Sequence, residues 1–143
     1  MELLFKKEAY EIVGACFEVY NEHRHGFKEQ IYHESLIHEF LMRKIPAVSK
    51  PQLQVRYKEL VLNTVCEPDF VCYGKIILEL KALSELTGDH RAQVLNYLKA
   101  TGFELGLLVN FGRPDQLQWE RIVRTENRES LSVNDSPPYI QKP

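Results

Sequence analysis

Apolar residues in the first third of the chain recur at every third or fourth position, which is the spacing of amphipathic helices. This pattern predicts a helix over residues 3–23, which His25-Gly26 would end. It predicts a second helix over residues 28–44. Ile45-Pro46 would end that helix, because the residue before a proline is pushed out of the helical conformation.

The middle of the chain changes to strand-like patterns bounded by turn residues. Strands are predicted at residues 52–58, 60–65, 70–73 and 75–82, followed by a helix over 87–100 and further strands at 105–111 and 117–124. The run Ile76-Ile77-Leu78 is continuously apolar, which is typical of a central strand buried on both faces. The order predicts an α/β fold with one mixed central sheet flanked by helices.

The length of 143 residues favours one domain. We assign residues 1–124 to that domain. Residues 125–143 are polar and contain Pro137-Pro138, so they are predicted to form a flexible C-terminal tail.

The charge is unevenly distributed along the chain. Overall, 18 Lys and Arg against 20 Asp and Glu give a net charge of −2, which argues against a strongly basic, histone-like binder. Residues 1–40 carry four basic and eight acidic groups, whereas residues 41–60 carry five basic groups and one acidic group. Any contact with nucleic acid is therefore expected to be local, through Lys44, Lys50, Arg56 and Lys58.

Several classes of protein are not supported by the sequence. The first residues carry charges and lack the apolar region of a signal peptide, and no apolar run approaches a membrane span, so we expect a cytoplasmic protein without membrane contact. The three cysteines form no CxxC pair and the five histidines show no HxxxH or HExxH spacing. A zinc site is not expected.

A charged constellation stands out near the predicted centre of the sheet. Glu79 and Lys81 are two residues apart on one strand, so their side chains point to the same face. Asp69 lies on the preceding strand. A two-residue turn at Tyr73-Gly74 would turn Asp69 away from Glu79, whereas a three-residue loop over 73–75 would place the two carboxylates on one face.

Two converging carboxylates suit a hard divalent cation, Mg²⁺ or alternatively Mn²⁺, which can polarise a phosphoryl oxygen and lower the pKa of a bound water. Lys81 could then orient that water and neutralise charge on a phosphate. The alternative is an ion-pair cluster of Asp69, Glu79 and Lys81 that holds no metal.

The spacing Pro68-Asp69, nine residues, Glu79-Leu80-Lys81 resembles the signature of the PD-(D/E)XK nuclease superfamily. The segment Gly26–Tyr32 (GFKEQIY) resembles the motif that names the GxxExxY family, a branch of that superfamily. Residues 90–99, which contain Gln93 and Tyr97, resemble its third block, and residues 105–112 resemble the strand that follows. The resemblance covers roughly residues 5–124.

The resemblance implies a restriction-endonuclease-like core and assigns roles to particular residues. Asp69 and Glu79 would hold the metal, Lys81 would be the catalytic lysine, and Glu29 and Gln93 would complete the catalytic set. Tyr32 and Tyr97 would support it. Glu29 and Tyr32 could instead be an ordinary surface glutamate and a core-edge tyrosine, Gln93 could be solvated, and Tyr97 could simply pack against the core.

The resemblance implies a Mg²⁺-dependent nuclease that hydrolyses phosphodiester bonds in nucleic acid, with DNA favoured over RNA. The alternatives are a non-catalytic module on the same fold that binds nucleic acid or a protein partner, and a purely structural protein. A minimal core of this size could also form a homodimer or act with another protein.

Overall fold

The computed structural model describes residues 3–124, and the predicted C-terminal tail lies outside this range. The helices are α1 (Lys6–His23), α2 (Glu29–Arg43) and α3 (Gly88–Thr101). The strands are β1 (Ala47–Ser49), β2 (Leu53–Tyr57), β3 (Leu60–Cys66), β4 (Phe70–Cys72), β5 (Ile76–Lys81), β6 (Leu105–Asn110) and β7 (Gln118–Val123). The predicted helices and strands are therefore present, with ends that differ by a few residues.

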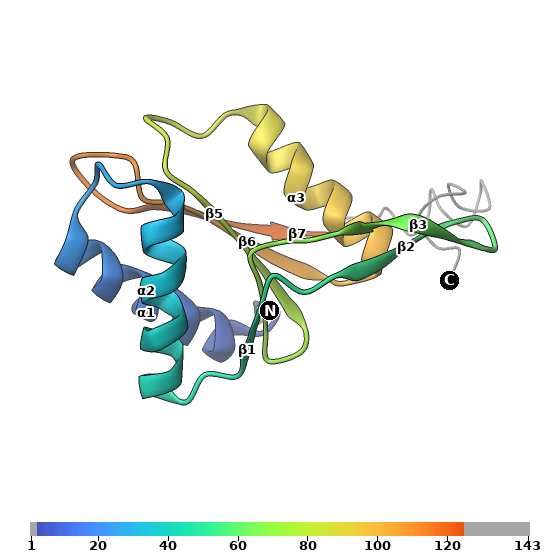
Figure 1. Cartoon of the computed structure of the whole chain (residues 1–143), viewed down its shortest axis with the longest axis horizontal. Coiled ribbons are helices and arrows are strands. Elements are labelled where there is room, and N and C mark those ends of the chain that lie inside the picture. The colour runs from blue at the N-terminus through green and yellow to red at the C-terminus, as the bar shows by residue number, and fades with distance from the viewer. Residues whose placement is uncertain (1–2, 125–143) are drawn as a thin grey trace.

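Five strands form one sheet in the order β1-β4-β5-β6-β7 (Figure 1). Strands β5 and β6 run parallel, joined through α3, and the other neighbours are antiparallel. The mixed sheet predicted from the sequence is thus confirmed. Residues Ile76–Leu80 of the central strand are all buried, as the apolar run predicts.

The two faces of the sheet have different coverings. Helices α1 and α2 pack on one face, where the largest apolar cluster joins them to Phe70, Leu78 and Leu107. Helix α3 packs on the other face, against Ile77 and Leu108. Because side chains alternate along β5, Glu79 and Lys81 share the face of Ile77, beside α3.

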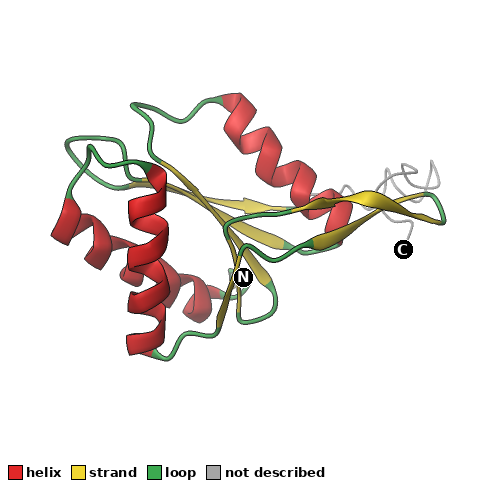
Figure 2. Ribbon diagram, viewed as in Figure 1, coloured by secondary structure: helices red, strands yellow, loops and turns green. Residues whose placement is uncertain are grey.

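Strands β2 and β3 do not belong to the main sheet, which corrects the expectation of one sheet containing every strand. They pair only with each other and form a two-stranded hairpin that projects from the body (Figure 2). Every residue of β3 from Leu60 to Val65 is exposed, so this segment buries too little apolar surface to become part of the layered core.

The three-residue strand β1 has no strand pattern of its own in the sequence. It pairs with β4 through three residue pairs from Ala47↔Cys72 to Ser49↔Phe70. A strand this short is defined by its partner rather than by local periodicity, so it was not predicted.

Candidate active site

The β4–β5 connection places the two predicted carboxylates on one face. Phe70 pairs with Leu78 and Cys72 with Ile76, which leaves a three-residue loop over 73–75. Continuing this register by one residue sets Asp69 opposite Glu79. Tyr73 and Gly74 adopt positive φ angles of 56° and 68°, so both residues of this loop have the left-handed backbone conformation. The three-residue loop, and not the two-residue turn, is correct.

Asp69 and Glu79 are both buried, and the carboxylate of each accepts a hydrogen bond from the backbone of the facing strand. The backbone N–H of Asp69 donates to Oε1 of Glu79 over 3.2 Å, and the N–H of Leu80 donates to Oδ2 of Asp69 over 2.8 Å. Each residue is 7% exposed. The two carboxylates are therefore fixed at the edge of the sheet where β5 ends.

Lys81 connects this pair to helix α3. Its Nζ lies 3.8 Å from Oε2 of Glu79 and donates to Oε1 of Gln93 over 2.9 Å. Gln93 in turn donates from Nε2 to the hydroxyl of Tyr97 over 3.3 Å. The predicted residues Gln93 and Tyr97, four positions apart on one helix face, thus meet the site through Lys81.

The loop after Lys81 is tied to the end of the neighbouring strand. The carbonyl of Lys81 accepts from the N–H of Phe111 over 2.8 Å. The side-chain amide of Asn110 both accepts from and donates to the backbone of Leu83, over 2.8 and 2.9 Å. These bonds fix the backbone of Lys81 and Leu83 against the end of β6, and so fix the position of the Lys81 Cα.

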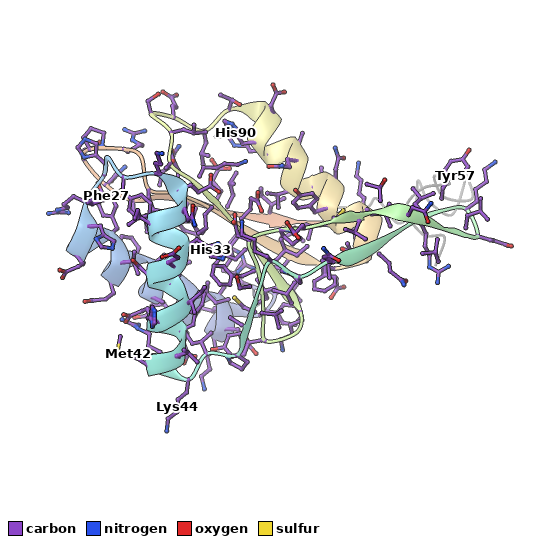
Figure 3. The ribbon with its side chains drawn as sticks, viewed as in Figure 1. Phe27, His33, Met42, Lys44, Tyr57 and His90 are labelled. Atoms are coloured by element: carbon purple, nitrogen blue, oxygen red, sulfur yellow. The ribbon has the colours of Figure 1, made fainter. Side chains whose placement is uncertain are left out.

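His33 also belongs to the site, although no sequence motif pointed to it. Its Nδ1 lies 3.1 Å from Oδ1 of Asp69, and its Nε2 lies 2.8 Å from the hydroxyl of Ser49. A carboxylate can only accept, so Nδ1 is the donor. The ring stacks on Phe70 at 4.3 Å between centroids and is 5% exposed. In Figure 3 His33 lies beside α2 on the side toward the sheet.

A single observation could have pointed to His33. It lies four residues after Glu29 on the same helix, so the two side chains share a face. The CxxC, HxxxH and HExxH spacings do not include such a pair. A Glu-x-x-x-His pair on the predicted helix was the available signal.

Glu29 and Lys50 stand at the open side of the carboxylate pair. They line a hollow of about 530 Å³ together with His33, Ser49 and Asp69. The Nζ of Lys50 is 4.0 Å from Oδ1 of Asp69, and its backbone N–H donates to the carbonyl of Asp69 over 2.8 Å. One predicted catalytic residue and one predicted phosphate contact therefore reach the same place.

Tyr32 anchors the loop that precedes α2. It is fully buried, and its ring stacks on Phe111 at 4.5 Å. Its hydroxyl donates to the carbonyl of Arg24 over 2.6 Å and accepts from the N–H of Phe27 over 3.2 Å. These bonds fix the loop between α1 and α2, and with it the start of the helix that carries Glu29.

The other predicted basic contacts do not gather at the site. Lys44 caps the far end of α2, whereas Arg56 and Lys58 lie on the hairpin, whose outer end is marked by Tyr57 in Figure 3. The basic segment 41–60 is therefore divided among separate parts of the surface, and only Lys50 reaches the carboxylates.

Burial and mutual repulsion raise the pKa of two acidic groups in the site. Burial, and next the charge of Asp69, raise the pKa of Glu79 well above its ordinary value, while Lys81 opposes the shift. Burial, followed by the charge of Asp69, also raises the pKa of Glu29, against the influence of Lys81 and Lys50. Burial is the larger cause in both cases, and repulsion among three carboxylates beside two lysines adds to it.

This charge balance fits a hard divalent cation. Within residues 3–124 no group of three or more His, Cys, Asp and Glu side chains is arranged to hold a metal ion, so a cation at this site would rest on the carboxylates of Asp69 and Glu79. Mg²⁺ needs only one or two carboxylates, because it keeps several waters. The closed four-ligand arrangement of a structural zinc site does not fit these residues.

A sequence profile of the PD-(D/E)XK nuclease superfamily matches residues 6–122. The chain belongs to this superfamily, whose members generally use divalent metals. The match contains each residue placed in the site above. No curated protein matches the chain.

A solved structure of low sequence identity shares the fold. The crystal structure of a protein named SSO0001 superposes with a TM-score of 0.51 and 20% sequence identity, covering 73% of this chain and 54% of that one. This chain therefore spans about half of that protein. An alkaline exonuclease (LHK-Exo) from Laribacter hongkongensis gives a TM-score of 0.49 with 11% identity, covering 94% of this chain and 77% of that one.

No helix within residues 3–124 has the length and apolar character to cross a membrane.

Proposed function

We propose that this chain is a divalent-metal-dependent nuclease of the GxxExxY branch, which hydrolyses phosphodiester bonds in nucleic acid, with DNA favoured over RNA. The observation that carries the proposal is the convergence of Asp69 and Glu79 beside a lysine held by a neutral partner, Gln93. The segment Gly26–Tyr32 supports the branch, because it places Glu29 at the same site.

Asp69 and Glu79 would hold the cation, Mg²⁺ or Mn²⁺. When bound, it would polarise a phosphoryl oxygen and lower the pKa of a coordinated water. Gln93 accepts a hydrogen bond from Nζ of Lys81 and so directs the ammonium group without competing for its charge. The Lys81 side chain is 17% exposed, so its ammonium group remains available to orient a water and stabilise charge on the phosphate.

Glu29 and Lys50 act at the entrance. Lys50 is mostly exposed and contributes a positive charge near Asp69, where a phosphate group would arrive. Glu29 is half-buried, and burial raises its pKa, so it keeps its proton to a higher pH than an ordinary glutamate and is a stronger base once ionised. The two residues would guide the strand and the attacking water, respectively.

Cleavage of plasmid DNA, single-stranded DNA and RNA, each with Mg²⁺ or Mn²⁺ and with EDTA, tests this function. The wild type should cut at least one substrate only with metal, and Lys81→Ala should be about 100-fold slower. Lys7→Ala, an exposed lysine on α1, is the matched control and should cut at the wild-type rate. Equal rates for Lys81→Ala and the wild type would refute the catalytic assignment.

Metal binding is tested separately by thermal unfolding. Mg²⁺ or Mn²⁺ should raise the melting temperature of the wild type but not that of Asp69→Asn, because a ligand stabilises only the state that binds it. Metal and nucleic-acid binding without cleavage would instead support the non-catalytic binding module. No response of either protein to metal would favour the ion-pair cluster.

A further inference from the structure

The β2–β3 hairpin begins and ends at the candidate active site. We call residues 53–66 the hairpin arm. The chain enters it after Lys50 and leaves it just before Asp69, and the N–H of Lys50 donates to the carbonyl of Asp69 over 2.8 Å at its base. The base of the arm is therefore joined to the carboxylate pair, and a molecule bound along the arm lies next to the candidate active site.

One face of the arm carries apolar residues at its base and at its tip. Leu53 pairs with Cys66 at the base, and Tyr57 pairs with Leu60 at the tip. The offset along each strand is even, four positions in β2 and six in β3, and the difference is taken up by a register shift between Gln54 and Arg56. Leu53 packs in a cluster with Leu98 of α3. Toward the tip this cover ends, and Tyr57 and Leu60 are 49% and 64% exposed. The apolar face thus runs out from under α3 into solvent.

Such an exposed ribbon is unusual unless it has a partner. A two-stranded hairpin is marginally stable in water, and contiguous exposed apolar residues mark sites of interaction. The charges on the arm indicate what kind of partner it has. Arg56 and Lys58 exceed the single acidic residue Glu59, and Nζ of Lys58 lies 5.4 Å from the centre of the Tyr57 ring. The tip therefore combines the aromatic ring of Tyr57 with positive charge, since Lys58 lies over that ring and Arg56 projects from the opposite face of the ribbon.

We propose that the hairpin arm binds an unpaired segment of the substrate strand, with Tyr57 stacking on a base while Arg56 and Lys58 contact phosphates. Unpaired bases expose the apolar faces that Tyr57 and Leu60 can cover. A duplex hides those faces and presents mainly phosphates, which the apolar face does not complement. That the bound strand is a substrate rests on the proposed nuclease function. Binding of a single strand to the arm can be measured without that function.

The length of the arm sets the size of the segment. Strand β3 has seven residues, which span about 23 Å at about 3.3 Å per residue. This distance corresponds to about seven nucleotides at the stacked spacing of 3.4 Å per strand. A 15-nucleotide strand can reach from the carboxylates to the tip, whereas a 5-nucleotide strand in the site cannot.

Binding is measured by fluorescence anisotropy in the Lys81→Ala background, which prevents cleavage, with 15- and 5-nucleotide single-stranded DNA and a 15-base-pair duplex. The double variant Tyr57→Ser/Leu60→Ser should weaken binding of the 15-nucleotide strand at least tenfold. Binding of the duplex should change less than twofold, and the 5-nucleotide strand, which cannot reach from the carboxylates to the tip, should bind the parent more weakly than the 15-nucleotide strand does. The control Tyr10→Ser/Leu41→Ser removes two side chains that are 79% and 70% exposed on α1 and α2, and it should bind as the parent does.

Three results would overturn the proposal. One is equal binding of the 15-nucleotide strand by the arm variant and the control. Another is equal weakening for the strand and the duplex. The third is a wild-type dimer that the arm variant converts to a monomer, by sedimentation, without loss of DNA binding, which would assign the arm to contact between copies.

A charge variant, Arg56→Gln/Lys58→Gln, should lower the salt dependence of binding to the 15-nucleotide strand by about two phosphate contacts. An unchanged salt dependence contradicts the phosphate contacts. The two proposals fail separately. If the wild type cuts nothing but the arm variant loses binding, the nuclease function fails and the arm remains a binding site. If the wild type cuts single strands and the arm variant binds and cuts them equally well, only the arm proposal fails.

Discussion

Nζ of Lys81 donates a hydrogen bond to Oε1 of Gln93 over 2.9 Å, which joins the last residue of the central strand to the middle of α3. The same ammonium group is 3.8 Å from Oε2 of Glu79. Lys81 is thus held between a neutral and an ionisable partner, and its position depends on two elements that are separate in the sequence. This relationship makes the packing of α3 part of the site.

Removal of the Gln93 side chain should slow the reaction without unfolding the protein. In Gln93→Ala, Lys81 loses the partner that directs it, and we expect the single-turnover cleavage rate to fall about tenfold, equivalent to about 1.4 kcal/mol. Asn96→Ala removes an exposed amide from the same helix and is the control. Equal rates for the two variants would show that Gln93 does not position Lys81.

His33 should act on metal affinity through Asp69. In His33→Leu, Oδ1 of Asp69 loses its hydrogen-bond donor, and the carboxylate is then held mainly through Oδ2, which accepts from the N–H of Leu80. Loss of such a partner commonly weakens metal binding 10- to 100-fold, so we expect at least a tenfold rise in the Kd for Mn²⁺ by calorimetry. His38→Leu changes an exposed histidine on the same helix and should bind Mn²⁺ as the wild type does. Wild-type affinity in His33→Leu contradicts the role.

Glu79 should make the metal-free protein less stable as the pH rises. Burial and Asp69 raise its pKa in the folded protein to about 8 from 4.5. Below pH 4.5 the residue is protonated in both states and contributes nothing. Between pH 4.5 and 8 only the unfolded chain releases the proton, so the free energy of unfolding falls across this window and stays low above it.

The test of this pH dependence is Glu79→Gln, which cannot ionise. Its melting temperature in EDTA should exceed that of the wild type by an amount that grows from pH 5 to pH 8.5, reaching about 5 °C. Glu18→Gln, at an exposed position on α1, should show no such trend. A temperature difference that does not vary with pH would mean that Glu79 ionises normally in the fold.

Gly106 should be required for the close approach of α3 to the sheet. A Cβ at this position would lie 2.6 Å from Cγ1 of Val94. Gly106→Ala should therefore lower the free energy of unfolding by about 1–3 kcal/mol in urea and displace the helix that carries Gln93. Gly88→Ala, where a Cβ meets no atom within 4 Å, should not be destabilising.

A second substitution separates crowding from other effects of Gly106→Ala. Val94→Ala removes the atom that the new methyl group would strike. The double variant should then be less destabilised than the sum of the two single variants, and cleavage should recover in part. Strict additivity of the two changes would exclude a clash between these side chains.

The sequence by itself determined every helix and strand except β1, as well as the relative orientation of Glu79 and Lys81. Both follow from local rules, because an apolar run of this length favours a buried strand and side chains two positions apart on a strand share a face. The spacing of Asp69 from Glu79 narrowed the hairpin to two alternatives but could not choose between them. Backbone conformation at Tyr73 and Gly74 made that choice.

Only the tertiary structure decided what surrounds the carboxylates. His33, Ser49 and Lys50 reach Asp69 because α2 packs against the sheet edge and β1 adds to β4, and these long-range contacts leave no periodic signal in the chain. The separation of the hairpin arm from the main sheet has the same origin. Local alternation specifies a strand, but which strands pair, and which remain exposed, depends on the surface that the whole fold can bury.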